Sequence, residues 1–148
     1  PRVWLEDVPA SSADVHLFLK AVQRLIDAGA IPARTGAAGR DTFEELMWRL
    51  RLAFFRDARN IARREVQFEL AAGLGLPLAP IRSVLEDGTA MAELCRDLEL
   101  CKELSVGGSP TFVLNEGRQK LYGNVGYKVI AANVQEMLQR PEDQASWC

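Results

Sequence analysis

The sequence has very few residues that could bind a metal or act as a catalytic nucleophile with a base beside it. Its 148 residues include one histidine, His16, and three cysteines, Cys95, Cys101 and Cys148, with no C-x-x-C motif. A metal site or a histidine-activated nucleophile needs further partners, so we predict no metal site and no catalytic residue. Cys95 and Cys101 lie in one predicted helix, with Cα atoms roughly 10 Å apart. A disulfide requires about 7 Å or less, so we expect two buried, unpaired thiols.

A large excess of charge and long apolar runs are also missing. The net charge is −2, so there is no basic surplus to attract nucleic acid. The apolar runs fall far short of the ~20 residues of a membrane span. The first residues do not have the pattern of a secretory signal peptide, and there is no glycine-rich phosphate loop. We therefore expect neither a nucleic-acid nor a membrane partner.

What the chain does contain is amphipathic helix. Hydrophobic residues make up 48% of the sequence, enough for a globular core, and their spacing of three and four is typical of helices with one buried face. A capping box is predicted at Thr42–Glu45 and an N-cap at Asn60. The predicted helices span residues 12–28, 42 to about 59, 61–72, 80–87, 89–104 and 127–139. The glycine-rich residues 29–41 are predicted to form a mobile loop.

Two of these helices have predicted inward faces. In the fifth helix the face comprises Met91, Leu94, Cys95, Leu98 and Cys101. In the last helix it comprises Val129, Ile130, Val134, Met137 and Leu138. We expect these side chains to be buried.

The pattern changes to strands near the end of the chain. Thr111–Asn115 and Arg118–Tyr122 are predicted to form a hairpin around Glu116-Gly117. A shorter strand is predicted at Arg2–Leu5. Before the hairpin, Gly107-Gly108 allow a close backbone approach, and Pro110 biases Ser109 toward extended geometry. On composition alone, a plain loop entering an edge strand is favoured, and a binding role is left open.

Arginine is concentrated in one region, with six arginines between Arg49 and Arg64. Arg49, Arg56 and Arg63 recur every seven positions, which aligns them along one side of a continuous helix. Acidic residues are interleaved with them, so a solvated, salt-bridged face is the favoured prediction. A binding site for an anion or an acidic partner is the alternative.

The stretch "SVGGSPTFVLNEGRQKLYGNVGY", residues 105–127, resembles the second half of the DsbA family of thioredoxin-fold thiol–disulfide oxidoreductases. The similarity is closest to the branch of FrnE-like oxidoreductases that borders on the 2-hydroxychromene-2-carboxylate isomerases. The stretches "VWLEDVPASS" and "NIARREVQFELAAGLGL" support it, so that the resemblance covers roughly residues 1–139.

The resemblance implies an α+β, mostly α fold. Residues 1–10 and 106–140 would form a partial thioredoxin-like fold, a β-hairpin plus the C-terminal helix. Residues 11–105 would be an all-helical insertion, and residues 141–148 a polar tail. An open sheet edge would favour homo-oligomers.

The resemblance also assigns a site. It implies a cis Ser109–Pro110 bond, with Gly108, Ser109, Pro110 and Thr111 on the substrate-binding side of a thiol active site. The family's C-x-x-C motif would lie before Pro1, so we expect a truncated piece that is inactive by itself.

The expected function is cytoplasmic thiol–disulfide exchange. Its partner would be a thiol or disulfide protein or a small thiol, and no cofactor would be needed. Two alternatives are left open. The first is a glutathione-dependent isomerase or kappa-like transferase, and the second is a non-catalytic helical interaction module.

Overall fold

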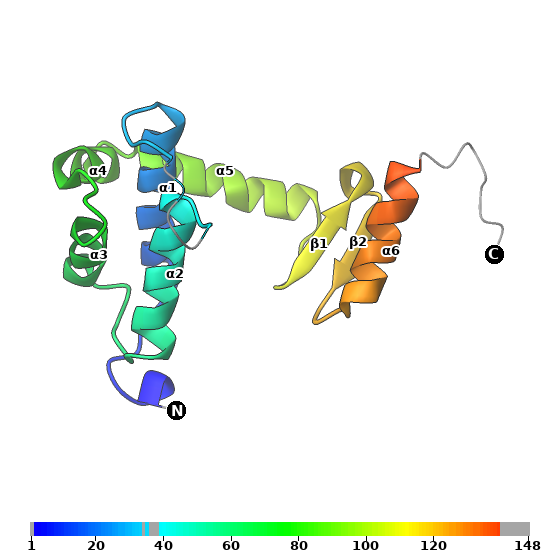
Figure 1. The fold of residues 1–148 in the computed structure, drawn as a ribbon, viewed down its shortest axis with the longest axis horizontal. Coiled ribbons are helices and arrows are strands. Elements are labelled where there is room, and N and C mark those ends of the chain that lie inside the picture. The colour runs from blue at the N-terminus through cyan, green and yellow to red at the C-terminus, as the bar shows by residue number, and fades with distance from the viewer. Residues whose placement is uncertain (1, 34, 36–38, 140–148) are drawn as a thin grey trace. The chain divides into compact units, whose positions relative to one another are not determined.

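The computed structural model describes residues 2–33, 35 and 39–139. These residues are mostly helical and include one two-stranded antiparallel sheet, in agreement with the predicted mostly α class (Figure 1). In chain order the elements are a 3-10 helix (Arg2–Trp4), α1 (Ala13–Asp27), α2 (Thr42–Phe55), α3 (Arg64–Ala72), α4 (Leu78–Glu86), α5 (Thr89–Glu103), β1 (Thr111–Leu114), a 3-10 turn (Asn115–Gly117), β2 (Gln119–Tyr122) and α6 (Tyr127–Leu138). Residues 34, 36–38 of the predicted loop and the predicted polar tail lie outside the described residues.

The chain divides into two compact units, which we call the helical unit (Pro1–Arg96) and the hairpin unit (Asp97–Cys148). The boundary falls inside α5, and residues 1–10 belong to the helical unit. The boundary between these units therefore differs from the predicted one, because the prediction groups residues 1–10 with residues 106–140. The thioredoxin-like assignment of those two segments stays a prediction.

The core of the helical unit is built around α1. The predicted one-sided stripe of this helix is confirmed, because Val15, Phe18, Ala21, Val22 and Leu25 are all buried. The Phe18 ring packs edge-on against Phe68 of α3 with centroids 5.6 Å apart. The other fully buried large side chains are Ile31, Leu46, Ile81 and Gln67. Apolar packing around one central helix thus supplies the stability of this unit.

Gln67 is the one buried polar side chain of the described core, and both ends of its amide are satisfied. Its Nε2 donates to the Ile61 carbonyl oxygen at 2.8 Å, and its Oε1 accepts from Arg64 at 2.8 Å. A buried amide is tolerated when it is hydrogen-bonded. This side chain therefore ties the turn before α3 to the core.

α2, α5 and α6 begin at the predicted residues, whereas α1, α3 and α4 begin one to three residues away from the predicted starts. The capping box is not Thr42–Glu45 but Asp41–Glu44, since Asp41 Oδ1 accepts from the Glu44 amide at 2.8 Å and the Glu44 carboxylate accepts from the Asp41 amide at 2.9 Å. Asn60 caps a turn rather than a helix, accepting from the Ala62 amide at 3.0 Å. The sequence contains several adjacent residues that can cap, and only the backbone geometry selects among them.

The predicted strand at Arg2–Leu5 is wrong, because Arg2–Trp4 is a 3-10 helix. Its amides bond locally, with Leu5 N–H donating to the Arg2 carbonyl at 2.9 Å. Asp7 then anchors the segment by accepting from Arg63 at 2.7 Å and Asn60 at 3.2 Å. These hydrogen bonds, the Arg63 bond first, hold the pKa of Asp7 below its usual range. A short β-prone run without a partner strand satisfies its backbone in a turn instead.

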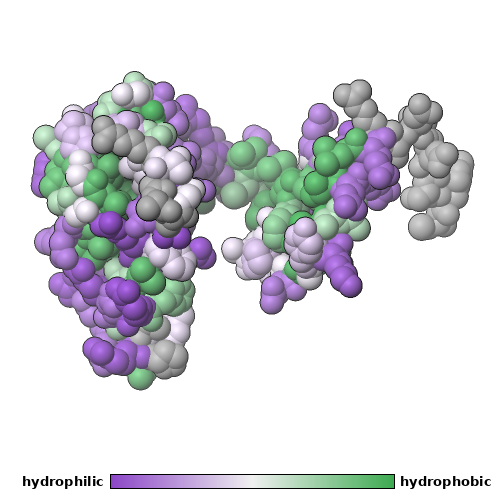
Figure 2. All heavy atoms as spheres, viewed as in Figure 1, coloured by the Kyte–Doolittle hydropathy of each residue, from purple (hydrophilic) through white to green (hydrophobic). Residues whose placement is uncertain are grey.

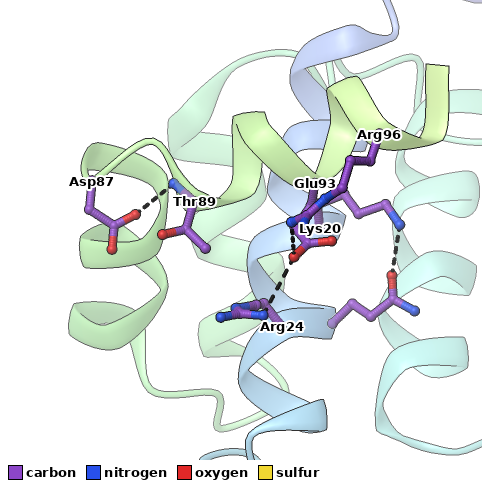
Figure 3. Close-up of polar contacts among 7 residues, drawn as sticks. Lys20, Arg24, Asp87, Thr89, Glu93 and Arg96 are labelled. Atoms are coloured by element: carbon purple, nitrogen blue, oxygen red, sulfur yellow. Dashed lines mark hydrogen bonds and ion pairs between the residues drawn. The ribbon is translucent and has the colours of Figure 1, made fainter. Parts of the chain in front are cut away.

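The first turns of α5 are anchored to the helical unit by polar contacts (Figure 3). Asp87 accepts from the Thr89 amide at 2.8 Å, and Glu93 accepts from Arg24 of α1 at 3.4 Å and from Arg96 at 2.5 Å. The hydrogen bond from the Thr89 side chain is the largest cause that lowers the pKa of Asp87. These contacts join the end of α4, the start of α5 and α1.

In the hairpin unit the two predicted strands are confirmed. β1 and β2 pair antiparallel, with Thr111 opposite Tyr122 and Leu114 opposite Gln119. Asn115, Glu116 and Gly117 all have positive φ in the connecting turn, the conformation that glycine adopts most readily. The Gln119 amide donates to Asn133 of α6, which ties the sheet to that helix.

The predicted inward faces of the last two helices are wrong. In α5 only Ala90 is buried, while Met91, Leu98 and both cysteines are exposed. In the described part of α6 no residue is buried, and Leu138 is 78% exposed. Figure 2 shows strongly apolar (green) side chains open on the surface over the strands of this unit. Two strands of four residues each are too small a sheet to cover an amphipathic helix.

Candidate functional site

The predicted docking segment is an exposed loop that leads into β1. Gly107, Ser109 and Pro110 are exposed, whereas Gly108 and Thr111 are half-buried. The Ser109–Pro110 peptide bond is cis. The structure therefore brings the four predicted site residues together at the start of an edge strand.

Two hydrogen bonds hold the loop in place. The Thr111 hydroxyl donates to the Gly108 carbonyl oxygen at 2.6 Å, which closes the loop on itself. The Pro110 carbonyl oxygen accepts from the Gly123 amide at 3.0 Å, which continues the hairpin pairing by one residue. The loop is thus fixed on the β2 side and open on the other.

Tyr122 completes this site, and sequence reasoning missed it. A Cβ atom at Gly108 would lie 2.9 Å from Tyr122 Oη and 3.0 Å from its ring, so a larger residue there would require the exposed Tyr122 side chain to shift. Tyr122 is directly opposite Thr111 in the sheet. The signal was available, since a hairpin centred on Glu116-Gly117 pairs these two positions.

The outer edge of β1 has no partner strand among the residues that the structure describes. Because Pro110 bonds to Gly123, the antiparallel alternation directs the backbone groups of Phe112 and Leu114 toward β2. The N–H and C=O groups of Thr111 and Val113 therefore point away from β2. Within the described residues no strand pairs with this edge. The edge therefore presents the backbone donors and acceptors of these two residues beside the exposed Ser109-Pro110 turn.

The groups that this site offers to a ligand are mainly backbone N–H and C=O groups. Lys120 lies opposite Val113 in the register, and the ion pair between Arg118 and Glu116 sits at the hairpin turn with 3.8 Å between the charged atoms. None of the loop residues from Gly107 to Pro110 carries a titratable side chain. The described geometry can hold an extended peptide, and a reacting thiol would have to come from elsewhere.

The remaining candidate residues do not join this site. Cys95 and Cys101 are free but exposed, so the prediction that they are buried is wrong. His16 is exposed on α1, and in the described part of the chain no group of three His, Cys, Asp or Glu side chains is placed to hold a metal. Cys148 lies outside the described residues.

The arginine series forms a salt-bridged surface, as favoured from the sequence. Arg49 pairs with Glu45 at 3.1 Å, Arg56 with Asp57 at 2.7 Å, and Arg63 with an acidic partner at 2.7 Å. Hydrogen bonds from Arg40 and Arg49 keep the pKa of Glu45 below its usual range. Each arginine of the series already has a carboxylate partner, and exposed pairs of this kind contribute little stability.

Comparison with known proteins adds no relative. No protein-family model matches the chain, and no curated protein matches it either. Among the described residues, every helix is too short or too polar to cross a membrane.

Proposed function

We propose that this chain is the substrate-docking part of a DsbA-like thiol–disulfide oxidoreductase. In this proposal the residues from Gly108 to Thr111 bind an extended segment of a protein substrate, and the reactive thiols lie outside the described residues. The helices between residues 11 and 105 correspond to the helical insertion of that family. The proposed reaction rests on the resemblance of residues 105–127 to that family. The proposed docking surface rests on the geometry of the site.

The observation that carries the proposal is the open edge of β1 directly after the exposed Ser109-Pro110 turn. An extended peptide can add to such an edge as a further strand, with its backbone groups bonded to Thr111 and Val113. Such binding does not depend on the substrate's side chains. It therefore suits an enzyme that must act on many unfolded proteins.

A turnover experiment tests the assignment. The protein expressed from its whole gene is expected to reduce insulin with dithiothreitol as the electron donor. The activity is expected to survive the double substitution Cys95→Ser and Cys101→Ser, because the proposal assigns the reaction to other thiols and both of these cysteines are free and exposed. It is expected to fall at least about a hundredfold when a cysteine of the C-x-x-C motif that the proposal requires is replaced by serine.

Two results would reject this assignment. One is an absence of insulin reduction in the whole protein. The other is a dependence of the activity on Cys95 or Cys101, which would move the chemistry to α5. Retention on immobilised glutathione without insulin reduction would favour the glutathione-dependent alternative instead.

A further inference from the structure

A second open surface belongs to the helical unit. α1 and α2 lie side by side (Figure 1). Residues of both helices line a groove of about 410 Å³. Leu19 and Met47 contribute to its apolar lining. Phe54 and Phe55 also line it, with ring centroids 4.9 Å apart, and Phe55 is 63% exposed. A concave apolar surface within the range of about 300–1,000 Å³ has the size of a small-molecule site.

Two of the charged groups that line the groove are already engaged. Arg40 pairs with Glu45 at 2.9 Å, and its guanidinium lies over the Trp48 ring at 5.1 Å. Glu44 accepts from the Asp41 amide at 2.9 Å as part of the capping box. Neither group is therefore available to a ligand without breaking an existing contact.

Among the described residues that line the groove, His16 and Arg51 are the ionisable side chains without a partner in a hydrogen bond or ion pair. Both line it, one from α1 and the other from α2. Both are exposed, and neither side chain has a hydrogen bond or ion pair with any other described residue. Arg51 carries a permanent positive charge and presents paired donors that suit a carboxylate. The free charge of this apolar groove is thus positive.

We propose that the groove binds a long-chain alkyl carboxylate. The alkyl chain lies against Leu19, Met47 and the two phenylalanine rings, while the carboxylate accepts hydrogen bonds from Arg51. Apolar burial provides the affinity, and the charge-assisted bonds select an acid over a neutral lipid. This site lies within the helical unit and does not rest on the proposed oxidoreductase function.

Calorimetric titration of the full chain with dodecanoate tests the inference. We expect saturable binding of one dodecanoate per chain, and binding at least about tenfold weaker for the Arg51→Gln variant. The matched control is Arg24→Gln, which removes an exposed α1 arginine outside the groove and is expected to leave binding unchanged. Methyl dodecanoate, which keeps the chain but has no charge, is expected to bind as weakly to the native chain as dodecanoate does to Arg51→Gln.

A second variant separates loss of the site from loss of the fold. Phe55→Asp places a negative charge in the groove at an exposed position, so it is expected to abolish binding while helix content is kept. Equal binding of dodecanoate and its methyl ester, or full binding by Arg51→Gln, would overturn the proposal. So would a chain that is dimeric without ligand and becomes monomeric in Phe55→Asp, since a second copy would then occupy the groove.

Discussion

Replacing Phe18 by alanine is expected to lower the free energy of unfolding of the helical unit by about 3–5 kcal/mol. Phe18 is 0% exposed and packs edge-on against Phe68. Its removal takes apolar area from the core and leaves a cavity that α1 cannot close, because that helix contacts both α2 and α4. Since domains of this kind are stable by only about 5–15 kcal/mol, the variant is expected to lose a large share of its stability.

Phe55→Ala is the matched control, because Phe55 is 63% exposed. Its substitution is expected to cost about 1 kcal/mol or less. Urea denaturation followed by far-ultraviolet circular dichroism measures both variants. Equal losses for the two phenylalanines would show that the core does not lie around α1.

The substitution Val113→Pro is expected to weaken binding of an unfolded polypeptide at least about tenfold. The Val113 N–H points away from β2, so proline removes a donor from the open edge while the pairing of Phe112 and Leu114 with β2 is kept. Proline is tolerated in an edge strand on its unpaired side. Its ring also blocks the approach of an added strand.

The measurement uses the fluorescently labelled insulin B chain with its thiols carboxymethylated, so that docking is observed without disulfide exchange. Val113→Thr serves as the control, because threonine keeps the N–H and favours strands. The same edge can pair with a second copy of the chain, and we therefore expect Val113→Pro also to abolish any dimer seen by sedimentation velocity. Unchanged binding in Val113→Pro, with the hairpin intact, would exclude pairing along this edge.

Local patterns predicted the elements that depend on neighbours in the sequence. The apolar spacing from Val15 to Leu25 predicted α1 and its buried face, since helical periodicity alone places those residues on one side. Glu116-Gly117 predicted the hairpin, because few sequences satisfy successive positive φ angles. Residue types alone favoured a plain loop before β1, and the docking role of Gly108–Thr111 rests on the resemblance and stays a prediction. The structure leaves Ser109 and Pro110 exposed.

Features that depend on distant partners could not be predicted. The sequence of α6 does have an apolar face. Whether that face is buried depends on how much sheet lies against it, and β1 and β2 cover only part of it. The Arg2–Leu5 segment had strand propensity but no strand to pair with among the described residues. In the same way, the cysteines of α5 were placed inward by periodicity although only the first turn of that helix reaches a core.

Hydrogen exchange at four amides of β1 would decide whether its outer edge docks peptides. In the free chain Thr111 and Val113 are expected to exchange rapidly, whereas Phe112 and Leu114 are expected to be protected by pairing with β2. Saturating carboxymethylated insulin B chain is expected to slow Thr111 and Val113 by about tenfold or more. If the B chain binds and these two amides still exchange at their free rates, the substrate docks elsewhere and the proposed role of the loop is wrong.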